Sequence, residues 1–314
     1  MMQDSLEIVD WAIVAAYFLL LALTSIILSQ NKIKSSRDYF TAGNKIPFFA
    51  AAISILATSQ SAATFLGAPE YAYRHNLSFI GFYFSALLGI YFVAYWLIPR
   101  FYAIKAVTVY EFLGDKYGVK AQRYTGLMFL LGQLLSSGVR LYIAALAISM
   151  ILFLDIAPLH VGFSILVLII GALAYTYVGG VRSIIFSDMI QAFVYIGAAF
   201  AVFWHLYKAL NSDFNSIVQT LANEDKLSLV TTSGDYSIFA LLSGWLLLNI
   251  AAYGLNQDMT QRALTCADTN QAKKSLFASI ILTIPVAFLF LIIGLLLYLY
   301  YPVSYTHLTL PTKR

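Results

Sequence analysis

The chain has 314 residues, of which 61% are hydrophobic and 11% charged, and its mean hydropathy is +0.79. A soluble domain averages about 25% charged residues, so this composition excludes a soluble protein and indicates the lipid bilayer as the solvent. The net charge of +4 comes from basic residues scattered between apolar stretches, which excludes a nucleic-acid surface. The single cysteine, Cys266, excludes a disulfide framework and a cysteine-rich metal site.

Apolar segments long enough to cross a bilayer recur along the whole chain. A spanning helix needs about 20 mainly apolar residues. We predict about eight such helices, over residues 10–30, 47–73, 77–98, 124–153, 159–178, 184–207, 237–256 and 275–301. Their continuous apolarity favours helices over the alternating strands of a barrel. The first segment is too long for a cleavable signal peptide, so the predicted fold class is an all-α membrane protein.

The loops between these segments differ in charge from one side of the membrane to the other. With the N-terminus outside, the inner loops carry 13 Lys and Arg residues and the outer segments carry 3. Cytoplasmic loops hold the excess of basic residues, so we predict an N-terminus outside the cell membrane. The inner residues 108–118 are predicted to form a short amphipathic helix that ends at Gly118, and the outer segment 208–236 a short helix.

The second segment contains the polar stretch "ATSQSAATFLGAPE", residues 57–70. A helix that only faces lipid has no need of so many hydroxyls, an amide, Gly67 and Pro69. A break near Ala57–Ser61 would expose carbonyls and direct half-helix dipoles into the middle of the membrane, as in transporters. The alternative is a kinked helix whose small residues permit close packing.

Asp188 lies in the stretch "YTYVGGVRSIIFSDMIQ", which opens the sixth segment after a predicted tight turn at Gly179 and Gly180. A carboxylate inside a membrane segment costs about 2.5–3.5 kcal/mol, so a functional role is the first expectation. Asp188, with Ser187 and Gln191 beside it, would serve a cation or a proton. The alternative is an interfacial aspartate that caps the helix start.

Arg140 lies near the middle of the fourth segment, in "LLSSGVRLYIAALAI". A buried guanidinium needs an anionic partner or a wet cavity. It would either pair with Asp188 or hold a substrate carboxylate bidentately. In the seventh segment, Asn249 and Tyr253 precede a polar cytoplasmic end, a weak signal by itself.

The sequence offers little for catalysis. Its histidines have no metal-like spacing, and no phosphate loop or nucleophile–base pair is evident; they are His75, His160, His205 and His307. We expect no enzyme and no cofactor. The composition changes after Tyr301-Pro302, so we expect residues 303–314 to be a non-native tail on a truncated transmembrane domain of residues 1–302.

Taken together, five stretches resemble the sodium:solute symporter family, whose members include sodium–glucose, sodium–monocarboxylate, sodium–iodide and sialic acid transporters. They are "SSRDYFTAGNKIP", "SQSAATFLGAPEYAYR", "TVYEFLGDKYG", "VGGVRSIIFSDMIQ" and "YGLNQDMTQRAL". The resemblance extends over about residues 5–300. It implies an inverted repeat of five plus five core helices after one extra N-terminal helix, with segments two to six as the first repeat and an incomplete second repeat.

The resemblance also implies site residues. Sodium would be bound by Ala57, Gln60, Asp188 and Ser187. The substrate would be bound by Ser59, Ser61, Thr64, Tyr83, Arg140, Asn249 and Tyr253. Among these, Thr64 and Tyr83 depart from the sugar carriers, and Arg140 resembles the arginine that holds the carboxylate in sialic acid symporters.

We therefore expect sodium-coupled symport of a small organic solute across the cytoplasmic membrane, with an anionic carboxylate such as a sialic acid or a monocarboxylate as substrate. Sodium is the coupling ion, and the expected partners are the substrate, sodium and the bilayer, with no nucleic acid. Two alternatives stay open: a sodium symporter for a neutral, sugar-like solute, with Arg140 structural, and a membrane sensor with a transporter-like domain.

Overall fold

The computed structural model describes residues 8–29, 35–176 and 180–301. The described chain is helical, with one isolated β-bridge between Thr231 and Ser237. The helices are α1 (Ile8–Ser29), α2 (Ser36–Thr41), α3 (Phe48–Ser59), α4 (Ala62–Arg74), α5 (Ile80–Phe92), α6 (Ile98–Ala103), α7 (Val109–Tyr117), α8 (Val119–Phe153), α9 (Pro158–Thr176), α10 (Gly180–Ala209), α11 (Phe214–Asn223), α12 (Ile238–Leu242), α13 (Gly244–Gly254), α14 (Gln257–Leu264) and α15 (Thr269–Tyr300). A π-helical turn, Val93–Leu97, joins α5 to α6.

The eight predicted apolar segments all appear as helices. Within the described residues, four uninterrupted helical stretches are long and apolar enough to cross a membrane: 77–103, 119–153, 180–209 and 269–300. Two more spans arise if bent pairs are counted as one each: α3 with α4, bent by 66°, and α12–α13 with α14, bent by 52°. The remaining two segments, in α1 and α9, are shorter apolar helices.

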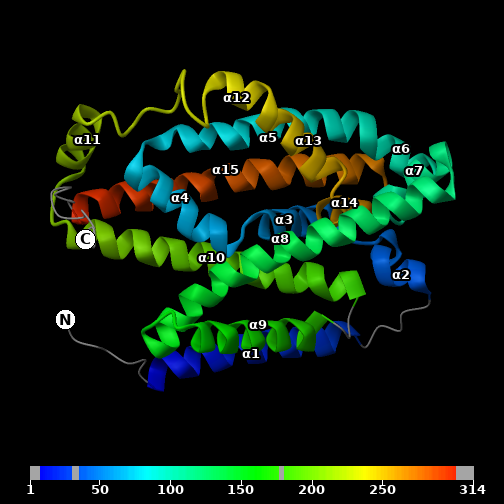
Figure 1. Cartoon of the computed structure of the whole chain (residues 1–314), viewed down its shortest axis with the longest axis horizontal. Helices are drawn as coiled ribbons and strands as arrows, with labels where there is room; N and C mark the ends of the chain where they lie inside the picture. The colour runs from blue at the N-terminus through cyan, green and yellow to red at the C-terminus, as the bar shows by residue number, and fades with distance from the viewer. Residues whose placement is uncertain (1–7, 30–34, 177–179, 302–314) are drawn as a thin grey trace, which may run out of the picture.

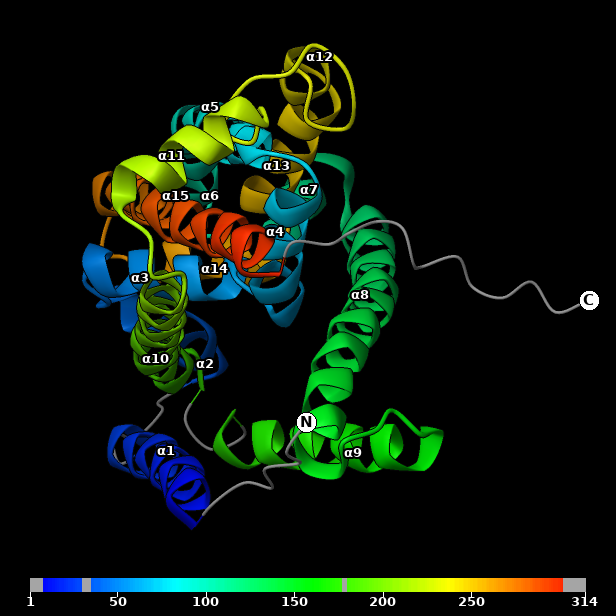
Figure 2. The same ribbon diagram turned by 90° about the vertical axis from the view of Figure 1, so that its left-hand side faces the viewer.

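Helix α15 is the centre of the bundle. It runs between α5 on one side and α3, α4 and α10 on the other, and it contacts all four (Figure 1). Its buried residues include the consecutive Leu289, Phe290 and Leu291, which point about 100° apart around the helix, as expected for a helix surrounded by other helices. Figure 2 shows α1 and α9 outside this bundle, with α8 leading from the bundle to α9.

Gly294 and Gly89 are two of the glycines that permit close approach between helices. A Cβ on Gly294 of α15 would lie 2.1 Å from the carbonyl oxygen of Pro69 in α4. A Cβ on Gly89 of α5 would lie 3.1 Å from the Cβ of Asn249 in α13. Both contacts fix the helices that carry the polar residues described below.

The loops divide between the two ends of the bundle. Figure 1 places α2, α6, α7 and α14 toward one end, and α11 at the other. The first end contains the predicted helix of residues 108–118, found as α7 and followed by Gly118 at φ +88°. The second contains α11, the helix expected in the outer segment.

Hydrogen bonds from side chains to main-chain carbonyls join α14 and the loop after it to neighbouring elements. The Tyr102 hydroxyl donates to the carbonyls of Ala263 at 3.1 Å and Cys266 at 2.9 Å. The Asn44 amide donates to the carbonyl of Leu264 at 2.6 Å, and the Gln261 amide donates to the carbonyl of Phe40 at 2.8 Å. These bonds hold α14 against α6 and the segment around α2.

Candidate functional site

The polar stretch of residues 57–70 is a broken helix, as predicted. Helix α3 ends where Gln60 N–H donates to the Leu56 carbonyl at 3.1 Å, and Gln60 and Ser61 are extended, with ψ of 126° and 173°. The hydroxyls of Thr58 and Ser59 donate back to the carbonyls of Ser54 and Leu56, at 2.8 and 2.7 Å. Such local bonds compete with a continuing helix, which explains the break physically.

A break of this kind produces two charged helix ends inside the bundle. The last carbonyls of a helix, here including that of Ala57, have no partner within the helix, and the same holds for the first N–H groups of α4. The C-terminal end of α3 therefore carries partial negative charge and the N-terminal end of α4 partial positive charge. The first suits a cation and the second an anion.

The side chains at the break contact three other helices. Gln60 is a hydrogen-bond partner of Tyr83 on α5, and its Oε1 accepts a bond of 3.5 Å from the Tyr195 hydroxyl on α10. Ser59 is a hydrogen-bond partner of Tyr253 on α13. The structure thus brings together four residues predicted for the site, Ser59, Gln60, Tyr83 and Tyr253, and adds Tyr195.

A cavity of about 230 Å³ lies between this break and α10. Its lining combines main-chain and polar groups of the break with two polar residues of α10. The residues are Leu56, Ala57, Gln60, Ser61, Ala62, Phe65, Gln191, Ala192 and Tyr195. Ala57 and Ser61, both predicted for the site, therefore face the same space.

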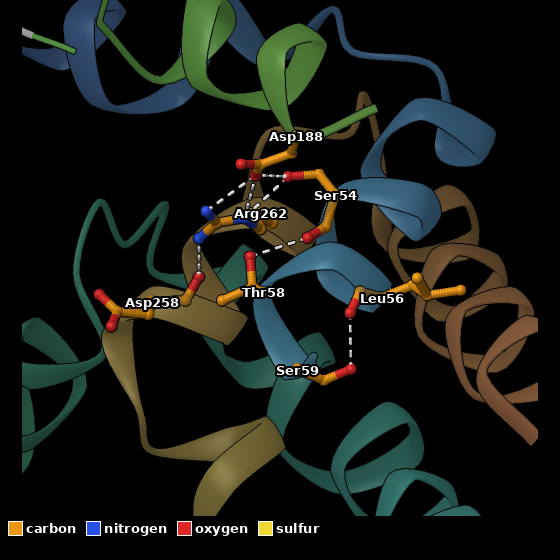
Figure 3. Close-up of polar contacts among 7 residues, drawn as sticks. All are labelled: Ser54, Leu56, Thr58, Ser59, Asp188, Asp258 and Arg262. Atoms are coloured by element: carbon orange, nitrogen blue, oxygen red, sulfur yellow. Dashed lines mark hydrogen bonds and ion pairs between the residues drawn. The ribbon is translucent and has the colours of Figure 1, made fainter. Parts of the chain in front are cut away.

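Asp188 of α10 is bound in a polar cluster with residues of α3 and α14 (Figure 3). Its Oδ2 accepts a bond of 2.5 Å from the Ser54 hydroxyl of α3. The same oxygen lies 3.0 Å from Nη2 and 3.1 Å from Nε of Arg262, from α14. The side chains of Arg262 and Asp188 are only 13% and 14% exposed, so this is a largely desolvated ion pair rather than a surface one.

The alternative pairing of Arg140 with Asp188 is wrong. Arg262 takes the place considered for Arg140. The Arg140 guanidinium instead bonds within its own helix, to the Ser136 hydroxyl at 3.0 Å and the Ser136 carbonyl at 3.4 Å. Among the described residues it has no carboxylate within ion-pair distance.

Two further predicted residues have buried polar atoms without a partner in the described structure. Asn249 is 1% exposed; its Nδ2 donates to the Phe82 carbonyl at 3.4 Å, while its Oδ1 has no partner. Ser187 is fully buried and its Oγ has no partner. An unpaired buried group costs about 1–3 kcal/mol, so both oxygens are available to a ligand. Thr64 is half-buried in the first turn of α4.

The residues that sequence reasoning missed are Tyr195 and, as the partner of Asp188, Arg262. The sequence places Arg262 among the basic residues of the inner loops, at the polar cytoplasmic end of the seventh segment. Its position within the stretch "NQDMTQRAL", on the same helix face as Asp258 one turn earlier, was the available signal. Within the described chain, no group of three or more His, Cys, Asp and Glu residues could hold a metal ion.

Comparison with known proteins agrees with the resemblance read from the motifs. The sequence model of the sodium:solute symporter family matches residues 39–305. The chain belongs to the sodium:solute symporter family. Members of the sodium:solute symporter family are transporters rather than enzymes, and with its apolar helices the chain is a multi-pass protein of the plasma membrane.

Bacterial sialic acid carriers are among the proteins similar to the chain. It is 28% identical over 297 residues to the sodium/sialic acid symporter SiaT of Proteus mirabilis, covering 93% of this chain and 59% of that protein. It is 29% identical over 272 residues to the sodium/sialic acid symporter NanT of Aliivibrio fischeri, covering 85% and 53%. The chain spans about three fifths or less of the length of these relatives.

A solved structure has the same fold over nearly the whole chain. It is described as the substrate-bound outward-open state of a Na+-coupled sialic acid symporter. The TM-score is 0.84 at 25% identity, over 94% of this chain and 62% of that one.

Proposed function

We propose that the protein performs sodium-coupled symport of a small organic anion that carries a carboxylate, such as a sialic acid or a monocarboxylate. The observation that carries the proposal is the broken helix α3–α4, whose break residues bond to α5, α10 and α13. A broken membrane helix with polar partners on three sides is the arrangement by which transporters hold ions and solutes. The names of the similar proteins support sodium and a carboxylate-bearing substrate.

On the sodium side, we propose the carbonyls of Ala57 and Gln60 with the side chains of Ser187 and Asp188. The carbonyls belong to the C-terminal end of α3, which favours a cation. Ser187 contributes a buried hydroxyl that has no partner in the described structure. Asp188 reaches the same helix, α3, through Ser54.

On the substrate side, we propose Ser59, Ser61, Thr64, Tyr83, Arg140, Asn249 and Tyr253. Five of them lie at the break or on α5 and α13 beside it. Arg140 lies on α8, which packs against α4. With only Ser136 as its recorded partner, the guanidinium retains donors for a carboxylate, and the bidentate geometry of Arg favours that group.

The orientation is also a proposal. The inner loops of the predicted topology, with 13 Lys and Arg residues against 3 outside, place the N-terminus outside the cell. The described loops from these two sets lie at opposite ends of the bundle in Figure 1, which supports the assignment.

The proposed repeat layout follows the same order. The extra helix α1 precedes a first repeat that runs from α3–α4 to α10, and α12–α14 with α15 open the second. The predicted non-native tail, residues 303–314, lies outside the described residues.

Coupling then requires that sodium and substrate bind the same state more tightly than its alternatives. Sodium at the end of α3 and substrate at the start of α4 share one break. Each ligand therefore stabilises the geometry that the other needs, and the coupling is reciprocal.

The test is sodium-dependent uptake in liposomes. Residues 1–301 would be joined to the part of the Proteus mirabilis symporter that the match leaves uncovered, with that symporter itself as positive control. We expect uptake of radiolabelled sialic acid in sodium but not in potassium, and inhibition by the free acid but not by its amide. Sodium-independent uptake would reject the coupling ion, and equal inhibition by acid and amide would reject the carboxylate.

A further inference from the structure

The guanidinium of Arg262 is surrounded by oxygens from three helices. Its Nε and Nη2 meet Asp188 Oδ2 of α10 at 3.1 and 3.0 Å, and its Nε meets Ser54 Oγ of α3 at 2.8 Å. Its Nη1 donates to the main-chain carbonyl of Asp258 in α14. A carboxylate, a hydroxyl and a carbonyl therefore converge on one cation (Figure 3).

We propose that Arg262 is a built-in cation that competes with sodium for Asp188. The inference rests on the proposed function, since it assigns a role to the residue that occupies a proposed sodium ligand. When Arg262 is on Asp188, the sodium position is closed; when sodium is on Asp188, Arg262 is displaced. The two cations cannot share Oδ2, because like charges at that distance repel strongly in a desolvated site.

The oxygens around the guanidinium suit a hard metal ion once the guanidinium has left. Hard cations take carboxylate, carbonyl and hydroxyl oxygens, and those are the three kinds present. Ser54 Oγ donates its proton to Asp188 Oδ2 at 2.5 Å, so a lone pair that now accepts from Arg262 Nε would be free to bind the ion. Asp188 Oδ2 on α10 and Ser54 Oγ on α3 keep their places when α14 moves, whereas the Asp258 carbonyl moves with α14.

Arg262 lies on a short helix, α14, that follows a bend in the chain. Helix α14 has eight residues and is bent by 52° from the pair α12–α13. It begins after Leu255 and Asn256, whose backbone lies between the two helices. A rotation of α14 at this bend would withdraw the guanidinium from Asp188, and it would break the bonds by which Tyr102, Asn44 and Gln261 hold α14 and the loop after it.

The consequence for transport is directional. In the described conformation Arg262 ties α3, α10 and α14 together at the end that the charge bias assigns to the cytoplasm. Return of the guanidinium to Asp188 would expel sodium from that ligand, and sodium on Asp188 would weaken the tie. The competition thereby links sodium binding at Asp188 to the position of α14.

The experiment measures the thermal stability of the purified 314-residue chain in detergent, in sodium, potassium and choline chloride at equal ionic strength. The variants are Arg262→Gln, Asp188→Asn and the double variant, with Arg123→Gln, an exposed arginine at the same end, as matched control. We expect a saturable, sodium-specific rise in Tm for Arg262→Gln at sodium concentrations that leave the Tm of wild type, Asp188→Asn and Arg123→Gln unchanged. If the site at Asp188 is open in a tenth of wild-type molecules or fewer, the sodium concentration that gives a stated rise in Tm should be at least about tenfold higher for wild type than for Arg262→Gln.

The double variant separates a site at Asp188 from sodium binding elsewhere. We expect it to lose the sodium-specific rise and to be more stable in choline than Arg262→Gln, since it contains no unpaired buried charge. Equal Tm in sodium and potassium for Arg262→Gln, or a sodium rise that persists in the double variant, would overturn the proposal. Arg262→Lys keeps a cation but not the planar fork, and should give a sodium requirement between those of Arg262→Gln and wild type. If Arg262→Gln does not fold, a sodium requirement of Arg262→Lys equal to that of wild type would also overturn it.

The outcomes separate this inference from the symport proposal. Sodium-coupled uptake by the liposome assay without any effect of Arg262 would leave symport standing and remove the competition. A sodium site that depends on Asp188 and opens in Arg262→Gln, without coupled uptake, would leave the cation exchange standing and remove symport.

Discussion

Replacing Gly294 by alanine should destabilise the protein by separating α15 from the broken helix. The new Cβ would lie 2.1 Å from the carbonyl oxygen of Pro69, about 1.3 Å inside the 3.4 Å at which ordinary contacts begin. The obstacle is main chain on both helices, so no side chain can rotate away. Overpacking of this kind costs about 1–3 kcal/mol, and we expect a value at the upper end because two backbones must move. The better helix propensity of alanine offsets about 1 kcal/mol, leaving a net loss of about 1–2 kcal/mol.

The matched control is Gly67→Ala on α4, where an added Cβ has no heavy atom within 4 Å. The assay is thermal unfolding of the detergent-purified chain, followed by intrinsic fluorescence. A net loss of about 1–2 kcal/mol corresponds to a fall in Tm of roughly 2–8 °C, whereas Gly67→Ala should unfold at the wild-type temperature or slightly above it. If Gly294→Ala kept the wild-type Tm, the close approach of α15 to α4 would be refuted. An equal loss in Gly67→Ala would show that glycine itself, rather than the contact, is what matters.

Three other outcomes are expected. Arg140→Lys should weaken uptake of the acid, and Arg140→Gln should weaken it further by removing a charged hydrogen bond of about 1.5–3 kcal/mol. The measurement is the substrate concentration for half-maximal uptake in the liposome assay. If both variants keep the wild-type value, Arg140 does not belong to the substrate site. Lys226 is buried, and its Nζ donates to the Tyr73 carbonyl at 2.8 Å. Lys226→Met leaves that carbonyl unpaired and should lower the free energy of unfolding by about 1–3 kcal/mol. Chemical or thermal unfolding would measure the loss. The hydrogen bond from His160 lowers the pKa of Asp155 below its ordinary 3.8, so its contribution is present above that pH and is lost as the pH falls through the lowered value. Asp155→Asn should lower Tm at pH 7, and the difference from wild type should shrink as the pH falls below 3.8; a constant difference would contradict the pairing.

Much of the fold could be predicted because a membrane-spanning helix requires a long run of apolar residues, which the sequence shows directly. The break at Gln60 and Ser61 was predictable for the same reason, since hydroxyls and an amide inside an apolar run have to be explained. The sequence could not show which helices meet across the bundle. Tyr195, for example, contacts Gln60 although 135 positions separate them, and one tyrosine among 22 gives no indication of such a contact.

The partner of Asp188 shows the same limit more sharply. A buried aspartate requires a cation, and Arg140 and Arg262 were both available within the helical region. Arg140 was considered because it lies deep inside a long apolar segment. Arg262 was not, because it follows the polar end of the seventh segment. The 52° bend before α14 turns that end back toward α3 and α10, and bend angles are not encoded in hydropathy.

The bonds that Tyr102, Asn44 and Gln261 make to main-chain carbonyls have a consequence for how this protein tolerates sequence change. A carbonyl oxygen is present whatever the side chain, so the residues that supply it, such as Leu264 and Phe40, can vary without loss of the bond. The donors cannot, because each bond depends on a hydroxyl or an amide at a fixed reach. In a saturation library scored for folded protein, few substitutions should therefore be tolerated at the three donors. At the residues that supply only the carbonyl, these bonds place no limit on the side chain.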